Sequence, residues 1–239
     1  MILYTHPTYY KMIHLMLSSF RKNQKINLLD YGCGNGYLFS ILPKEKINKY
    51  SGYDVSKNSI ETAKKIINYK NASFKLIDPE KPLNLGDSNS EDVVIAIGVL
   101  QYLKDEEIDA FINESHKVLK KGGILLISTV VDHIIYKILN IYGLVLPNKF
   151  INRDNIIKKL KNANFNVEYQ KESGLIIGPL VSHNLTIIPD ALDKIFFSTK
   201  GSLGIFGGTF RKISTPLMAL ENLVPLDYGY TLYIKARKD

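Results

Sequence analysis

The chain has 239 residues, 45% of them hydrophobic and 23% charged, so it can bury the core of one ordinary globular domain. Its single cysteine, Cys33, excludes an intrachain disulfide and any metal site built from several cysteines, as expected of a protein in a reducing compartment. The net charge of +8 would favour a nucleic acid or an anionic surface as partner if the cations were clustered, but the lysines are spread along the chain.

The N-terminal segment MILYTHPTYYKMIHLML lacks the basic region and the small-residue cleavage site of a secretory signal. The sequence also has no run of about 18 uncharged apolar residues, which a membrane-spanning helix would need. We therefore expect a cytoplasmic protein without a transmembrane span. Residues 1–25 are expected to form an N-terminal cap helix.

Strands and helices are predicted to alternate through the first half of the chain. The apolar run DVVIAIG at 92–98 is typical of a strand that is covered on both faces. Alternation of this kind implies a parallel sheet with right-handed crossovers. The predicted strands cover 26–31, 49–54, 73–77, 92–98 and 124–129, and the helices cover 37–42, 56–69 and 105–119.

The second half of the chain is less regular. Apolar residues at 3–4 spacing predict an amphipathic helix over 132–146, and a second helix begins at Asn152. Strands are predicted at 165–170 and 230–238. About 55 residues lie between those two strands, and we interpret them as an insertion because structureless connections of that length are uncommon.

The segment LLDYGCGNGYLF, at 28–39, places Gly32, Gly34 and Gly36 directly after the first predicted strand. A glycine turn between a strand and a helix exposes backbone N–H groups and lets a ligand approach closely. The dinucleotide pattern would need its third glycine at Tyr37, and the phosphate-loop Lys-Ser/Thr pair is missing. The turn is therefore ill suited to a pyrophosphate.

This turn resembles motif I of the class I S-adenosylmethionine-dependent methyltransferases. GYDVS, KLIDPEKPL, VVIAIGVLQYLKD and LKKGGILLIST resemble the family's later landmarks in the same order. The resemblance implies S-adenosylmethionine as cofactor and a Rossmann-like α/β fold, with a doubly wound, seven-stranded, mostly parallel sheet and an insertion before the last strand. Residues 1–239 would form one domain, with a cofactor-binding half at 26–131 and an acceptor cap or lid at 132–151 and 173–228.

The resemblance also assigns roles to individual residues. It places Asp54 on both ribose hydroxyls, where one carboxylate can accept two hydrogen bonds, and Asp78 on the adenine amino group. Each acid has an alternative role, because Asp54 could cap the following helix and Asp78 before Pro79 could form a turn. The remaining residues expected to hold the cofactor are Asp30, which would brace the turn, Gly32, Gly34, Gly36, Val55, Ile77, Gly98 and Val99.

Candidates for a general base follow the predicted fourth and fifth strands. Many small-molecule members of the family carry Glu-His after strand four, where this chain has Leu100-Gln101-Tyr102. We therefore consider His133, Asp132 and Tyr102 as catalytic candidates, with His183 as a further possibility. Tyr9 and Tyr10 are candidates for the pocket wall. No metal site is expected.

The predicted activity is O-methylation of a small-molecule, sugar or lipid-linked acceptor. The segment after strand four lacks the Asn/Asp-Pro-Pro-aromatic box that binds amino groups, which argues against methylation of bases or amides. Three alternatives stay open: a nucleic-acid methyltransferase, a non-catalytic interaction protein of the same fold, and an aminopropyl transferase. Helix 132–146 either packs on the sheet or forms a lid that also contacts a membrane or admits a lipid-linked acceptor. The sequence leaves the acceptor and the oligomeric state undetermined.

Overall fold

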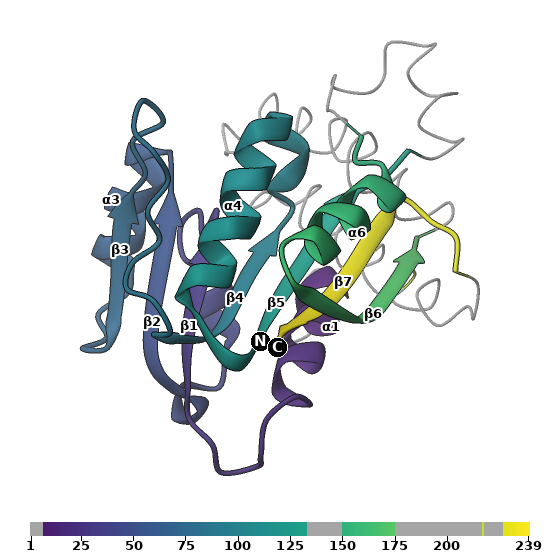
Figure 1. Ribbon diagram of the computed structural model, residues 1–239. Helices are drawn as coiled ribbons and strands as arrows, with labels where there is room; N and C mark the ends of the chain where they lie inside the picture. The colour runs from purple at the N-terminus through teal and green to yellow at the C-terminus, as the bar shows by residue number, and fades with distance from the viewer. Residues whose placement is uncertain (1–6, 133–149, 175–216, 218–226) are drawn as a thin grey trace.

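The computed structural model describes residues 7–132, 150–174, 217 and 227–239, and these form a seven-stranded sheet with helices on both faces (Figure 1). The strand order across the sheet is β3-β2-β1-β4-β5-β7-β6. The strands are β1 (Ile26–Tyr31), β2 (Ile47–Asp54), β3 (Ala72–Leu76), β4 (Glu91–Ile97), β5 (Leu119–Val130), β6 (Phe165–Ser173) and β7 (Thr231–Lys238).

The predicted doubly wound topology is confirmed. Strands β1 to β5 pair in parallel, whereas β7 runs antiparallel to both β5 and β6. The strand order reverses between β1 and β4, where Tyr31 lies opposite Tyr53 of β2 on one side and Ala96 of β4 on the other. Ligands of such sheets bind at the carboxyl ends of the strands beside this switch point. The glycine turn follows β1 and so occupies that place.

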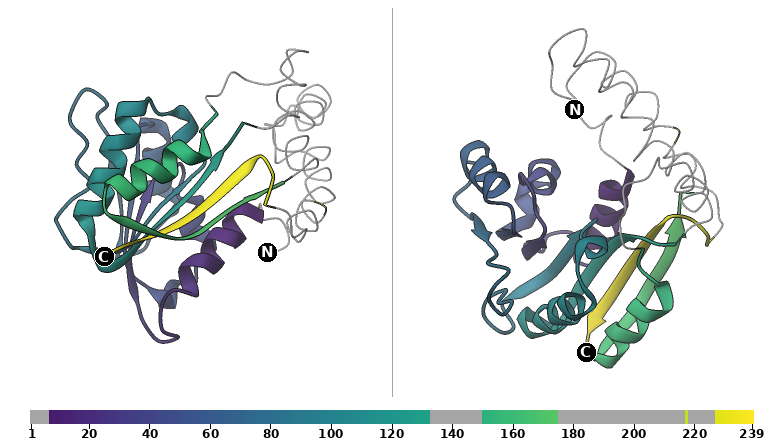
Figure 2. Two further views of the ribbon diagram at one scale, coloured as in Figure 1. Left: turned by 45° about the vertical axis from the view of Figure 1, so that its right-hand side comes forward. Right: turned by 90° about the horizontal axis from the view of Figure 1, so that it is seen from above.

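The helices divide between the two faces of the sheet because adjacent strand residues point to opposite sides (Figure 2). Leu28 packs with α1 (Pro7–Leu17), α2 (Tyr37–Ile41) and α3 (Lys57–Ile66). Its neighbour Leu29 packs with α4 (Asp105–Val118) and α6 (Arg153–Asn162) on the other face. Two short 3-10 helices, η2 (Lys44–Lys46) and η3 (Leu100–Tyr102), complete the described elements.

The two largest differences from the predicted boundaries concern the first helix and β5. The N-terminal helix ends at Leu17 rather than near residue 25, because the hydroxyls of Ser18 and Ser19 donate to the Leu15 carbonyl and compete with the helical backbone bonds. Strand β5 begins at Leu119 rather than at 124. The LKKGG segment is part of the strand, and a register shift between Glu91 and Val93 on β4 accommodates it.

Helix α3 begins with a side-chain cap, as the sequence predicts. The Ser56 hydroxyl accepts a hydrogen bond from the Ser59 N–H at 3.3 Å. Ser56→Ala is expected to lower the free energy of unfolding by about 1 kcal/mol, and Ser56→Gly by only a few tenths. Urea unfolding followed by circular dichroism measures both. Equal losses in the two variants would contradict the capping role.

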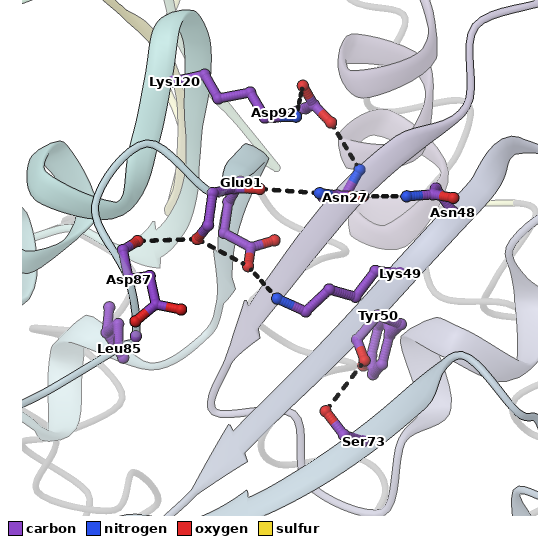
Figure 3. A network of polar contacts seen from close by, with 12 residues as sticks. Asn27, Asn48, Lys49, Tyr50, Ser73, Leu85, Asp87, Glu91, Asp92 and Lys120 are labelled. Atoms are coloured by element: carbon purple, nitrogen blue, oxygen red, sulfur yellow. Dashed lines mark hydrogen bonds and ion pairs between the residues drawn. The ribbon is translucent and has the colours of Figure 1, made fainter.

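Polar side chains gather at the amino ends of the strands, opposite the glycine turn (Figure 3). Asp92 accepts from the Asn27 backbone N–H and from Lys120, both at 2.8 Å. The buried Glu91 pairs with Lys49 at 2.8 Å. Glu91 and Asp92 are therefore each matched by a cation, which is the usual condition for burying a charge. We interpret the network as structural.

Among the described residues, no helix combines the length and the apolar character that crossing a membrane requires.

Candidate active site

The glycine turn is held in a conformation that side chains disfavour. Gly32, Gly34 and Gly36 have φ angles of 76°, 53° and 77°, in the left-handed region. The N–H groups of Gly32 and Cys33 both donate to the Tyr53 carbonyl, at 2.7 and 3.0 Å, and tie the turn to the end of β2. A Cβ atom on Gly32 would lie 2.3 Å from a methyl carbon of Val99, whereas one on Gly34 would meet nothing within 4 Å.

Asp54 ends β2 directly beside this turn. Its Oδ2 accepts from the Gly34 N–H and its Oδ1 from the Ser56 N–H, both at 2.8 Å. The second bond matches the helix-preceding role that the sequence left open for Asp54. A carboxylate has about four acceptor positions, so each oxygen keeps one for a further donor such as a ribose hydroxyl. The geometry allows both roles at once.

The residues expected around the adenine follow β2 and β3. Val55 is 61% exposed, an unusual state for a valine, and lies next to Asp54. The Ile77 N–H donates to the Asp54 carbonyl at 2.8 Å, so Ile77 lies at the same strand end. The structure thus brings Asp54, Val55 and Ile77 together.

Asp78 lies one residue beyond Ile77, in an exposed turn. Its carboxylate accepts from Lys81 at 3.0 Å and from the Glu80 N–H at 3.1 Å. The bond from Lys81 is the main reason why the pKa of Asp78 is lowered. The turn-forming role is therefore present, and the adenine role stays a prediction.

Asp30, the last acid before the turn, is only 3% exposed. Its carboxylate accepts from the Tyr50 hydroxyl at 2.5 Å. Burial raises the pKa of Asp30 to about 7; the Tyr50 bond opposes this rise and the nearby Asp54 charge adds to it. Burial also raises the pKa of Tyr9, and the charge of Asp30 adds to that effect.

Because the pKa of Asp30 is raised in the folded protein, the free energy of unfolding should depend on pH. Between the ordinary value of 3.8 and about 7 the folded protein binds more protons than the unfolded chain, so the free energy of unfolding falls as pH rises through this window. Asp30→Asn cannot titrate, and its stability relative to wild type is expected to increase by about 4 kcal/mol between pH 4 and 8. Urea unfolding across this range measures the difference. A difference that is independent of pH would contradict the raised pKa.

A second turn, after β4, lies against the glycine turn. Gly98 has a φ of 66° and its N–H donates to the Ser128 carbonyl at 2.8 Å. The side chain of Gln101 donates to the Gly98 carbonyl at 2.9 Å and accepts from the Thr129 hydroxyl at 3.0 Å. Because Val99 packs on Gly32, this hydrogen-bonded bridge fixes the ends of β4 and β5 relative to the glycine turn.

A cavity of about 220 Å³ opens beside Gly98. It lies between α1 and the carboxyl ends of β4 and β5, with the start of β7 as a further wall. Among its described lining residues none carries a formal charge at neutral pH. They are Thr8, Tyr9, Ile97, Gly98, Gln101, Ser128, Thr129, Val130, Tyr230 and Thr231.

A family described as a methyltransferase domain matches residues 22–190, a span that contains the glycine turn, Asp54 and the Gly98 turn. The chain belongs to this methyltransferase family. Its cofactor is S-adenosylmethionine, as the sequence predicts, and the predicted enzyme class is confirmed.

The relatives of this methyltransferase act on different acceptors. A ubiquinone biosynthesis O-methyltransferase of Pelagibacter ubique is 31% identical over 173 residues, which are 63% of this chain and 70% of the relative. A malonyl-[acyl-carrier protein] O-methyltransferase of Bacillus anthracis is 33% identical over 127 residues, 50% of this chain but only 44% of that protein. The fold is shared with magnesium protoporphyrin IX methyltransferase of Synechocystis, whose structure contains bound S-adenosylhomocysteine. The two structures superpose with a TM-score of 0.61 and 16% sequence identity, and the superposition covers 97% of this chain and 82% of that one.

The predicted catalytic residues of the methyltransferase are only partly located. Tyr102 ends η3 with 68% of its surface exposed and does not line the cavity. Asp132 is exposed just beyond β5, at the sheet edge where the sequence places it. His133 and His183 lie outside the described residues, as do most of the expected cap regions 132–151 and 173–228. Tyr9 lines the cavity and Tyr10 does not.

Sequence analysis missed Gln101 and the hydroxyl residues of β5. In the sequence Gln101 stands out only as a departure from the Glu-His pair, yet it is buried and links two strand ends. A signal was available in ILLISTV, where Ser128 and Thr129 interrupt an otherwise apolar buried strand. Polar groups buried at a strand end usually have a hydrogen-bonding duty.

Proposed function

We propose that this methyltransferase transfers the methyl group of S-adenosylmethionine to an oxygen atom of a small-molecule, sugar or lipid-linked acceptor bound in the cavity beside Gly98. One observation carries the proposal. The Gly98–Val99 turn contacts the glycine turn through Val99 and lines the cavity through Gly98. A cofactor on the glycine turn and an acceptor in the cavity would therefore meet at this turn.

For the cofactor, we assign the ribose hydroxyls to the free acceptor positions of Asp54. The exposed side chain of Val55 and that of Ile77 flank the adenine, and Asp78 receives its amino group. Gly32, Gly34 and Gly36 let the methionine part approach the backbone, and Gly98 and Val99 form the opposite wall. Support comes from the bond between Asp54 and Gly34, which joins the ribose acid to the turn.

For the acceptor, the cavity favours an uncharged group of modest size. A cavity of about 150 Å³ holds a benzene ring, so 220 Å³ suits one ring with small substituents. The hydroxyls of Thr8, Ser128 and Thr129 offer hydrogen bonds to substituents on such a ring. The names of the relatives from Pelagibacter ubique and Bacillus anthracis, both O-methyltransferases, agree with oxygen as the nucleophile.

The reaction is an in-line displacement. The acceptor oxygen forms a bond to the methyl carbon while the carbon–sulfur bond breaks, and the sulfonium becomes a neutral thioether. Alignment in a site that excludes water supplies most of the acceleration. The hydroxyl proton passes to a general base, for which we propose Asp132 or His133 after β5, with Tyr102 as a further candidate.

The test is methyl transfer from labelled S-adenosylmethionine to a panel containing phenols, carboxylic acids, sugars, a prenylated phenol and transfer RNA. Label in an oxygen of a small acceptor is expected. Label in RNA would favour the nucleic-acid alternative and overturn the proposal.

A substitution in the wall of the cavity tests whether the acceptor binds there. Residue Leu126 of β5 packs with α1, so Ser128, two residues on, faces the same side as Thr8 and Tyr9. Ser128→Leu should fill the cavity and lower kcat/KM for the acceptor at least about tenfold, with the Kd for S-adenosylmethionine nearly unchanged. Ser40→Leu, at an exposed position on α2, is the matched control. Unchanged kcat/KM in Ser128→Leu would place the acceptor elsewhere.

A further inference from the structure

We infer that Asp30 is a specificity-determining residue: it gives up a proton when the sulfonium cofactor binds, and so favours S-adenosylmethionine over the uncharged thioether product. The inference rests on the proposed placement of the cofactor's methionine part at the glycine turn. It concerns how the protein distinguishes two ligands that differ by one methyl group and one positive charge.

The surroundings of Asp30 contain no compensating cation. Its carboxylate accepts from the Tyr50 hydroxyl on β2, and the other titratable groups that interact with it electrostatically are Tyr9 on α1, the Cys33 thiol in the turn and the carboxylate of Asp54. Tyr37 of α2 contacts Tyr9 edge-to-face, with ring centroids 5.0 Å apart. No ion pair joins Asp30 to a lysine, arginine or histidine in the part of the chain that the structure describes.

This arrangement contrasts with that of Glu91, the other deeply buried acid in the described part of the chain. Glu91, at the opposite edge of the sheet, is as buried as Asp30 but pairs with Lys49 at 2.8 Å. A buried carboxylate normally has such a partner, because removing a charge from water without one is costly. Asp30 instead has one hydrogen-bond donor and a second acid nearby, so its charged state is under-compensated until a cation arrives.

The cofactor supplies that cation. S-adenosylmethionine carries a sulfonium, an ammonium and a carboxylate, for a net charge of about +1 near neutral pH, whereas S-adenosylhomocysteine lacks the sulfonium and has about zero. With its pKa raised to about 7, Asp30 is partly protonated near neutrality, and a nearby positive charge shifts it to the ionised form. By linkage, deprotonating Asp30 must strengthen binding of the cation by the same factor.

The same coupling acts during turnover. Methyl transfer converts the sulfonium to a thioether, so the charge that stabilised ionised Asp30 disappears with the reaction. Asp30 then takes a proton from solvent, and the product loses the electrostatic attraction that the substrate had. We expect product release to be favoured over substrate release as pH rises to about 7.

Calorimetric titration of the full chain with S-adenosylmethionine and S-adenosylhomocysteine from pH 5.5 to 7.5 tests this inference. The ratio Kd(SAH)/Kd(SAM) is expected to rise about tenfold across the range in wild type and to stay flat in Asp30→Asn. Titration at pH 6.5 in two buffers of different ionisation enthalpy should show more proton release with S-adenosylmethionine than with S-adenosylhomocysteine, because only the former adds the sulfonium charge. The upper limit of pH 7.5 avoids most of the titration of the ligands' amino groups, near pH 8.

Two further variants keep the test decisive if Asp30→Asn does not fold. Tyr50→Phe removes the bond to the carboxylate, and should move the midpoint of the rise to higher pH. Glu91→Gln neutralises a buried acid far from the turn and should leave the rise intact. If wild type binds both ligands and Kd(SAH)/Kd(SAM) does not change with pH, the inference about Asp30 is wrong, whereas the proposed cofactor site is retained. Failure of the folded protein to bind either ligand would instead contradict the proposed cofactor placement.

Discussion

Asp54→Ala is expected to weaken S-adenosylmethionine binding at least about a hundredfold. The substitution removes the acceptor for the Gly34 and Ser56 N–H groups, both at 2.8 Å, and the proposed acceptor for the ribose hydroxyls. Charge-assisted hydrogen bonds contribute about 1.5–3 kcal/mol each, so the loss of two to the ligand alone gives this magnitude. Release of the glycine turn adds to it. Calorimetric titration with purified variant and wild type measures the change.

Two controls separate the ligand contacts from the structural ones. Asp54→Asn keeps one carbonyl oxygen as acceptor but loses the charge, and should retain an intermediate affinity. Glu61→Ala removes an exposed acid from α3 and should bind like wild type. A folded Asp54→Ala variant with unchanged affinity would refute the ribose assignment and place the cofactor away from the end of β2.

Gly32→Ala is expected to lower both the stability of the fold and the affinity for the cofactor. Its Cβ would lie 2.3 Å from a Val99 methyl carbon, and the φ of 76° is strained for any residue with a Cβ. Overpacking costs about 1–3 kcal/mol and a left-handed conformation about 1–2 kcal/mol, so we expect a loss of about 3 kcal/mol in stability. Because Val99 and Gly32 join the two turns, cofactor affinity should fall as well. Urea unfolding and calorimetry measure the two effects.

Gly34→Ala is the matched comparison for the steric part. Gly34 also has a positive φ, of 53°, but its Cβ would meet nothing within 4 Å. The variant should therefore lose only about 1–2 kcal/mol in stability. In the double variant Gly32→Ala/Val99→Ala the clash is relieved, and stability should exceed that of Gly32→Ala alone. If Gly32→Ala and Gly34→Ala were equally stable, the contact with Val99 would not matter.

The parallel half of the sheet could be predicted from sequence because its signals are local. Runs such as DVVIAIG are apolar without interruption, and glycine or capping residues mark their ends. The boundaries predicted for the first helix and for β5 are wrong because hydrogen bonds that the apolar pattern does not reveal determine them. Ser18 and Ser19 compete with helical hydrogen bonds, and LKKGG pairs with β4 through a register shift that only the neighbouring strand specifies.

Some residues of the candidate site could likewise be identified from a local sequence pattern, and others could not. Asp54 and the glycines could be identified because each is adjacent in sequence to the strand end that positions it. The bridge from Gln101 to Thr129 spans two strands, so no local pattern shows it. The same holds for Thr8, whose hydroxyl lies 3.1 Å from that of Tyr233, at the other end of the chain. Contacts of this kind depend on the assembled sheet.

The position of β7 has a consequence for how the protein is made. Thr231–Lys238 is the last strand in sequence, yet it lies between β5 and β6 and pairs with both. During synthesis β6 emerges from the ribosome long before β7, its one partner among the described strands, and until then the edge of β5 that β7 covers stays unpaired. Exposed edges of this kind invite pairing between chains. A nascent chain stalled before residue 231 would therefore carry a complete glycine turn and an incomplete sheet, and its survival would depend on chaperones.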